Sequence, residues 1–167
     1  MMQPIDPTIA LAPHVLRVRP EWIDYNGHLN LAYYIVAFDQ GVDKLFEIIG
    51  IGLDYRKNDE LGTFAAETHT LYEREVKEND PLRIVCHILA VDDKRMHMFL
   101  EMFHAEEGYR AAAQEILYLH VDLKIRRVSP WPAPIRARIA SLAAHCATIP
   151  VPAGVGRKIT LPPPRKS

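Results

Sequence analysis

The chain has 167 residues, of which 49% are hydrophobic and 25% charged, the composition of one globular domain large enough to bury a core. Its formal net charge of −1 gives no reason to expect nucleic acid or an anionic membrane surface as a partner. No apolar stretch approaches the roughly 20 residues that span a bilayer, and the N-terminus lacks the basic start and apolar run of a signal peptide.

The two cysteines, Cys86 and Cys146, form neither a metal-ligand pattern nor a disulfide framework. Unpaired thiols are typical of proteins from a reducing compartment, so we expect a cytoplasmic protein. The sequence contains no motif that indicates a bound metal ion or cofactor.

Residues 1–13 contain three prolines and are expected to form an extended N-terminal arm. Residues 14–20 predict a short strand, with Val15 facing inward. The strand is expected to end at Pro20, because proline has no N–H for a sheet ladder. The loop that follows carries Asp24.

The clearest helix follows that loop. Apolar residues recur at three- and four-residue steps from Leu31 to Ile49 and make one broad apolar stripe. Asn30 is a candidate N-cap, and Gly50 and Gly52 are natural terminators. The polar side of this predicted helix carries Asp39, Gln40, Asp43, Lys44 and Glu47.

Four later segments are rich in apolar and β-branched residues and are separated by turn residues, which predicts four strands over residues 63–77, 82–91, 96–103 and 109–123. Short turns favour antiparallel pairing. Three prolines precede a predicted helix over 135–146, and residues 150–167 form a Pro-rich basic tail. The order predicts an α+β fold in one domain over residues 14–149.

Asp24 lies where the first strand gives way to the long helix. A carboxylate there faces the helix N-terminus, whose N–H groups can polarise a carbonyl or hold an oxyanion. Gly27 allows a ligand to approach the backbone closely. Thioester hydrolysis needs these features and a slot for the substrate. The alternative is that Asp24 to Gly27 is an ordinary turn, with Asn26 as a turn residue.

The run from Val18 to Asn30, VRPEWIDYNGHLN, resembles the signature of the 4-hydroxybenzoyl-CoA thioesterase-like hotdog family. The resemblance covers residues 14–124. It implies a sheet of about five antiparallel strands wrapped around the long helix, and an acyl-CoA substrate. It also implies a homodimer or dimer of dimers with active sites at the interface.

By the same resemblance, Asp24 is the catalytic nucleophile or general base, and Gly27 and His28 line the thioester carbonyl beside Asn30 at the helix start. The chain departs from the pattern at Trp22, because many members have an acidic residue there.

Four segments, 21–28, 67–69, 93–97 and 119–122, are most similar to the betainyl-CoA thioesterases of that family, which also occur as C-terminal parts of fused L-carnitine dehydrogenases. The resemblance implies a role in carnitine breakdown. A trimethylammonium acyl group favours an aromatic cage. The candidate cage residues are Trp22, Tyr25, Tyr33 and Phe64.

Two further residues are candidates for the site. Glu67 is placed to orient a water molecule or to pair with His28, and Arg95 to meet a CoA phosphate. The alternative for each is an ordinary solvent-facing side chain.

Two other functions stay open. Hotdog enoyl-CoA hydratases carry Asp-x-Asn-Pro-x-His, which this chain approaches, although Gly27 replaces the proline and His28 comes one residue early. A non-catalytic acyl-CoA-binding sensor is the second alternative, but binding alone does not need a carboxylate beside the thioester. Release of free thiol from acyl-CoA substrates separates the three functions.

Overall fold

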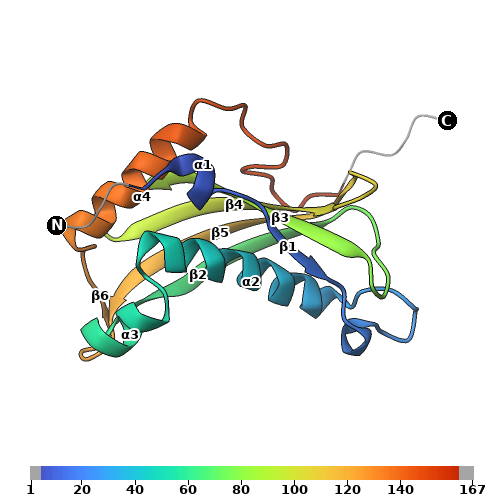
Figure 1. The fold of residues 1–167 in the computed structure, drawn as a ribbon, viewed down its shortest axis with the longest axis horizontal. Coiled ribbons are helices and arrows are strands. Elements are labelled where there is room, and N and C mark those ends of the chain that lie inside the picture. The colour runs from blue at the N-terminus through green and yellow to red at the C-terminus, as the bar shows by residue number, and fades with distance from the viewer. Residues whose placement is uncertain (1–4, 162–167) are drawn as a thin grey trace.

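A computed structural model describes residues 5–161 of the chain. An antiparallel sheet in the order β1-β3-β4-β5-β2 curls around the long helix α2 (Figure 1). Its strands are β1 His14–Arg17, β2 Leu61–Tyr72, β3 Pro81–Val91, β4 Arg95–His104, β5 Arg110–Asp122 and the short β6 Arg127–Val128, which pairs with β5. The helices are α1 Pro7–Ala10, the 3-10 helix η1 Pro20–Trp22, α2 Leu31–Ile49, α3 Leu53–Asp59 and α4 Ala133–Cys146.

Helix α2 begins and ends where the sequence predicts. The side chain of Asn30 accepts a hydrogen bond from the N–H of Ala32 at 3.0 Å, which satisfies one of the free donors of the first turn. Gly50 ends the helix in the left-handed conformation with φ 94°. A Cβ at Gly41 would lie 2.6 Å from the side chain of Ile84, so this glycine allows α2 to pack closely against β3.

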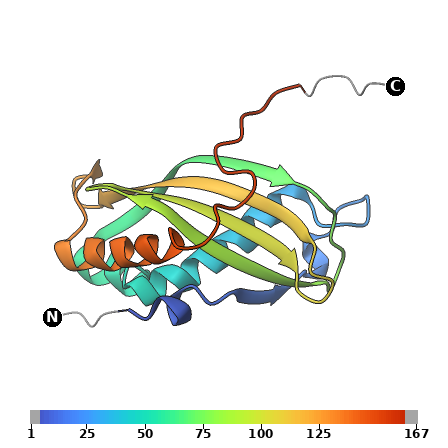
Figure 2. The same ribbon diagram turned by 90° about the horizontal axis from the view of Figure 1, so that it is seen from above.

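The predicted α+β hotdog architecture is confirmed, and so is the order of its main elements. The core lies between α2 and the sheet, and α4 packs against β3. The alternating residues Met96, Met98, Leu100 and Met102 of β4 are completely buried. In the view from above, the segment after α4 crosses the sheet on the side away from α2 (Figure 2).

Several local predictions differ from the structure. Val15 is 60% exposed, because Leu16 and Val18 take the inward positions of the alternating strand. Strand β2 ends at Tyr72 rather than at residue 77. Helix α3 was not predicted, and its seven residues bury only Tyr55. The N-terminal arm contains the short helix α1, capped by Asp6.

The C-terminal segment is anchored to the sheet over part of its length. The guanidinium of Arg110 donates to the carbonyl oxygen of Ala153 at 2.9 Å, and the N–H of Gly156 donates to a carboxylate oxygen of Glu115 at 2.7 Å. The expected basic tail therefore lies partly on the outer face of the sheet. The final residues, 162–167, lie outside the described part of the chain.

A completely buried histidine joins α3, β5 and the segment before α4. The Nδ1 atom of His120 lies 2.9 Å from the carbonyl oxygen of Ser129, and its Nε2 atom lies 2.7 Å from the hydroxyl of Tyr55. A carbonyl can only accept, so Nδ1 carries the proton and the Tyr55 hydroxyl donates to Nε2. Burial lowers the pKa of His120 below its ordinary value of 6.5.

This histidine should make the stability of the fold depend on pH. Its folded-state pKa is depressed, so the unfolded chain takes up the proton first as the pH falls below about 6.5. We expect the free energy of unfolding to decrease between about pH 6.5 and 5. The His120→Gln variant should show a shallower decrease in urea-unfolding measurements, whatever its absolute stability. The exposed His145 provides the control substitution. Equal pH slopes for wild type and His120→Gln would contradict this prediction.

Candidate active site

The loop before α2 forms a tight turn that orients the Asp24 carboxylate. The N–H of Gly27 donates to the carbonyl oxygen of Asp24 at 3.0 Å, and the N–H of Asp24 donates to the carbonyl oxygen of His28 at 3.1 Å. Gly27 has a φ of 82°, which side chains rarely tolerate. One carboxylate oxygen of Asp24 accepts from the N–H of Asn26 at 2.8 Å. The other oxygen has no hydrogen bond from the part of the chain that the structure describes.

A shallow pocket of about 340 Å³ lies beside this turn. It is bounded by the N-terminal end of α2 and by the end of β2 with the residues that follow it. The lining residues are Asp24, His28, Leu29, Leu31, Tyr34, Tyr72, Glu73, Arg74 and Glu75. The pocket therefore places the Asp24 carboxylate near the positive end of the helix dipole.

His28 lines the same pocket as Asp24. The Nε2 atom of His28 lies 3.6 Å from a carboxylate oxygen of Glu75. The hydroxyl of Tyr72 donates to the carbonyl oxygen of Leu31 at 3.3 Å, which ties the end of β2 to the start of α2. Glu75 was missed from the sequence because it follows the strand in an irregular segment, and no motif marks it.

The four expected cage aromatics do not come together within one chain. Trp22 is 4% exposed, and its ring stacks on that of Tyr33 with the centroids 5.8 Å apart. The guanidinium of Arg19 lies 5.2 Å from the Trp22 ring centroid. Tyr25 projects from the turn with 97% exposure, and Phe64 lies on β2. Trp22 and Tyr33 therefore stabilise the fold around the turn.

Glu67 and Arg95 lie away from the Asp24 pocket. Glu67 lines a different pocket of about 440 Å³ that includes His97 and Gly156. Arg95 forms an ion pair with Asp92 at 2.6 Å in the turn between β3 and β4. The predicted pairing of Glu67 with His28 is therefore replaced by the contact between His28 and Glu75.

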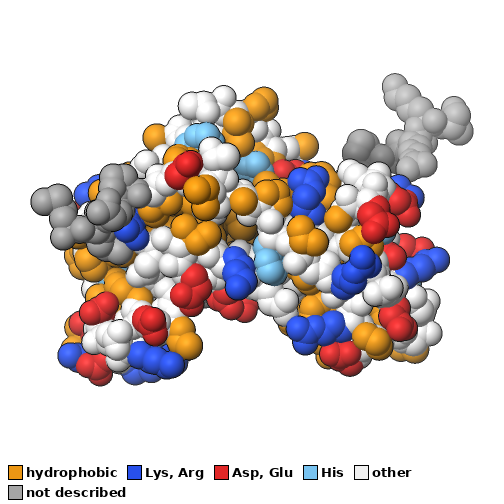
Figure 3. All heavy atoms as spheres, viewed as in Figure 1, with side chains coloured by type: hydrophobic (Ala, Val, Ile, Leu, Met, Phe, Trp, Pro, Cys, Tyr) orange, Lys and Arg blue, Asp and Glu red, His pale blue; other side chains and the backbone are white. Residues whose placement is uncertain are grey.

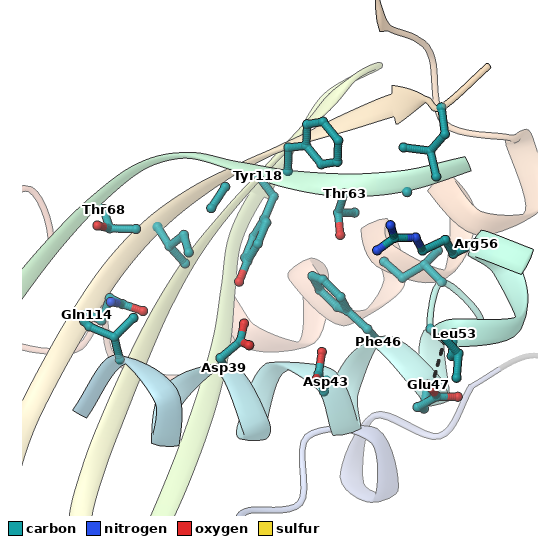
Figure 4. A pocket seen from close by; sticks show the side chains of 18 residues that line it. Asp39, Asp43, Phe46, Glu47, Leu53, Arg56, Thr63, Thr68, Gln114 and Tyr118 are labelled. Atoms are coloured by element: carbon teal, nitrogen blue, oxygen red, sulfur yellow. Dashed lines mark hydrogen bonds between the residues drawn. The ribbon is translucent and has the colours of Figure 1, made fainter. Parts of the chain in front are cut away.

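A larger groove was not anticipated from the sequence. It has a volume of about 580 Å³ and lies between α2, α3 and β2. Asp39, Asp43 and Glu47 point into it from α2, the side predicted to be the polar outer surface (Figure 4). Residues three or four apart on a helix share one face, so this acidic row was visible in the sequence. What the sequence did not show is that α3 and β2 form the other walls of a groove along this row, in which the three acidic residues remain exposed.

The surface and the interior give few other candidate sites. The space-filling view shows acidic and basic side chains interspersed, without an extended patch of one sign on that face (Figure 3). Within residues 5–161, no group of three or more His, Cys, Asp or Glu side chains is placed to hold a metal ion. Over the same range, no helix is long and apolar enough to cross a membrane.

Comparison with known proteins agrees with this geometry. Residues 18–139 match the family model of the Thioesterase-like superfamily. A betainyl-CoA thioesterase from Pseudomonas aeruginosa is 39% identical over 150 residues, which cover 89% of this chain and 93% of the relative. An L-carnitine dehydrogenase/betainyl-CoA thioesterase from Rhizobium meliloti is 32% identical over 143 residues, which cover 86% of this chain and 29% of that longer protein.

Solved structures lead to the same family. A Staphylococcus aureus protein solved in complex with CoA superimposes with a TM-score of 0.85 at 30% sequence identity, covering 91% of this chain and 96% of that chain. The family match spans most of the chain, and the fold agrees with it. The chain therefore belongs to the Thioesterase-like superfamily of hotdog proteins, and its chemistry is hydrolysis of acyl-CoA thioesters.

Proposed function

We propose that the protein hydrolyses a small acyl-CoA, betainyl-CoA, in the cytoplasm, with Asp24 as nucleophile or general base. The observation that carries this proposal is the Asp24 carboxylate, which one backbone N–H orients at the N-terminal end of α2. The acyl group is proposed from the similarity to betainyl-CoA thioesterases over most of the chain.

The reaction breaks the C–S bond of the thioester and forms a C–O bond. As nucleophile, Asp24 adds to the carbonyl carbon, CoA leaves as the thiolate, and water then cleaves the acyl–aspartyl anhydride. As general base, it takes a proton from the attacking water. In both routes the products are the free acid and CoA thiol. The positive end of the α2 dipole favours the negative charge that develops on the carbonyl oxygen.

His28 is proposed as a positioning residue. Its side chain lines the same pocket and lies 3.6 Å from Glu75, a distance that allows the carboxylate to orient the imidazole without a short hydrogen bond. In this arrangement His28 holds the thioester or a water molecule near Asp24.

A specific feature disfavours the hydratase alternative. Gly27 occupies the place of the proline in the hydratase pattern, and it has a φ of 82°. Proline is restricted to a φ near −65°, so the hydratase loop cannot take the same backbone path at this position. The sensor alternative leaves the oriented Asp24 carboxylate without a role.

The first test is the Asp24→Asn variant. The substitution keeps the size of the side chain and its ability to accept from the N–H of Asn26, but it removes the negative charge. We expect kcat for betainyl-CoA to fall by a factor on the order of 100 or more. KM should change far less, because substrate contacts stay in place. Free-thiol release and thermal unfolding would be measured on the same samples.

A folded Asp24→Asn protein with near wild-type turnover would exclude Asp24 from the chemistry. If the carboxylate only stabilises the turn, the substitution should instead lower the unfolding free energy by roughly 0.5–2 kcal/mol. His28→Ala should give a smaller loss of kcat than Asp24→Asn. Glu75→Gln, which keeps the shape of the His28 partner, is the matched control for the positioning role.

The proposed active form is a homodimer or a dimer of dimers. Strand β2 is 12 residues long, and within residues 5–161 it pairs with β5 on one side and with no strand on the other. A long open edge strand is a template for pairing with another chain. A two-fold dimer that joins two β2 edges would extend the sheet across both protomers.

Sedimentation provides the measurement for this assembly. The chain has a mass of 19.0 kDa, and we expect a species of twice or four times that mass at micromolar concentration. A single species of 19.0 kDa under conditions where the enzyme is active would rule out the dimer as the active form.

A further inference from the structure

The groove between α2 and β2 has features that the Asp24 pocket does not explain. Its floor and walls combine carboxylates from α2 with aromatic rings from both layers, and Figure 4 shows these side chains converging on one space. The ring of Phe46 meets that of Tyr118 edge to face, with the centroids 5.2 Å apart. Phe64 of β2 also lines the groove.

The three carboxylates of this groove lie close together on one face of α2, where their negative charges repel one another. Asp39, Asp43 and Glu47 follow one another at four-residue steps on α2. Burial and the charges of the other two raise the pKa of Asp43 above its ordinary value. Glu47 accepts a hydrogen bond from the N–H of Leu53. In the described part of the chain, no Lys, Arg or His forms an ion pair with Asp39 or Asp43.

The hydroxyl of a largely buried tyrosine opens onto the same space. Tyr118 is 6% exposed, yet its hydroxyl has no hydrogen bond within residues 5–161. Figure 4 shows it directed from β5 toward Asp39 on α2. The Tyr118 side chain is otherwise buried, and no group in the described part of the chain satisfies its hydroxyl where it faces Asp39 across the groove. A polar group held in this way, beside carboxylates that have no ion-pair partner in the same part of the chain, indicates a place for a ligand.

We propose that this groove binds the cationic end of the acyl group, with Asp39, Asp43 and Tyr118 as the residues that select a quaternary ammonium. This inference rests on the proposed thioesterase function. A trimethylammonium group has no N–H to donate, so a site can recognise it only through negative charge and the faces of aromatic rings. The groove offers both. Arg56 of α3 also lines the groove, but three carboxylates outnumber this one cation. The net negative charge disfavours the phosphates of CoA and leaves the groove to the acyl end.

The Asp24 turn of the same chain is too far from this groove for one acyl group to contact both. Asp39 lies eight positions after Leu31, which is about 12 Å along the helix. The Asp24 turn lies beyond the N-terminal end of α2, farther still from Asp39 (Figure 1). In a betainyl group, which is a trimethylated glycine, the nitrogen and the carbonyl carbon are only about 2.5 Å apart. One acyl group therefore cannot reach the Asp24 pocket and Asp39 of the same chain.

A β2-joined dimer removes this difficulty. Antiparallel pairing of two β2 edges places the Tyr72 end of one strand opposite the Leu61 end of the other. The hydroxyl of Tyr72 donates a hydrogen bond to the carbonyl oxygen of Leu31 at the start of α2. Residues 62–65, at the other end of β2, line the groove. Asp24 of one protomer is thereby brought toward the groove of its partner, and the site is complete only in the dimer.

The first experiment measures selectivity for charge alone. 3,3-Dimethylbutyryl-CoA has the shape of betainyl-CoA with carbon in place of the ammonium nitrogen. For the wild type we expect kcat/KM to be at least ten-fold higher for betainyl-CoA than for this neutral analogue. The Asp39→Asn/Asp43→Asn double variant should lower that ratio at least ten-fold. Asp59→Asn, an exposed substitution on α3, is the control and should preserve the ratio.

Thermal unfolding of the variants shows whether a loss of selectivity comes from a loss of folded protein. Because the pKa of Asp43 is raised, its charge opposes folding, and Asp43→Asn should unfold at the same or a higher temperature than the wild type. Wild-type protein that cleaves neither thioester would overturn the proposed function. Wild-type protein that cleaves both equally, or a double variant that keeps the wild-type ratio, would overturn only the cation site.

The second experiment tests the shared site. Heterodimers of Asp24→Asn protomers and Asp39→Asn/Asp43→Asn protomers, isolated with two affinity tags, contain one complete composite site. We expect about half of the wild-type rate on betainyl-CoA. A site within one chain would leave the heterodimer with no intact site. The composite site would therefore be contradicted if the rate of the heterodimer did not exceed half the rate of the Asp39→Asn/Asp43→Asn homodimer.

Discussion

The close seating of α2 against the sheet is the constraint on which the rest of the structure depends. Gly41 allows the helix to contact Ile84 of β3, because any side chain at position 41 would clash with that of Ile84. The Asn30 cap and the Gly50 terminator set the two ends of the helix. These contacts place the Asp24 turn at one end of α2 and the row of carboxylates along the side that faces β2. The position of both sites therefore follows from the packing of one helix.

The long periodic elements could be predicted from the sequence because each has a strong local signal. The stripe from Leu31 to Ile49 and the alternating methionines of β4 are such signals. The methionines are buried, and so is most of the stripe, but Leu31 is 65% and Ile35 37% exposed. Short or edge elements carry weaker signals. In β1 each phase of the alternation holds one apolar residue, Val15 in one and Leu16 in the other, so the pattern does not decide which of them faces inward. The seven residues of α3 are too few for a clear period.

The candidate site was predictable only where residues close in sequence form it. Asp24, Gly27 and His28 belong to one turn, and the structure keeps them together. Glu67 was one candidate partner for His28, but the structure places Glu75 beside it, because the end of β2 decides which side chain reaches the turn. The groove required tertiary information, since α3, β2 and β5 supply the residues that face the acidic row across the groove.

The central claim is that Asp24 carries out thioester hydrolysis. Single-turnover kinetics test this claim most directly, because the observed rate then does not include product release. Enzyme in excess over betainyl-CoA would be followed by free-thiol formation for the wild type and for Asp24→Asn. The account predicts a rapid phase for the wild type and a rate slower by a factor on the order of 100 for the variant, with the thioester bound but intact. A variant that releases thiol as fast as the wild type would contradict the account.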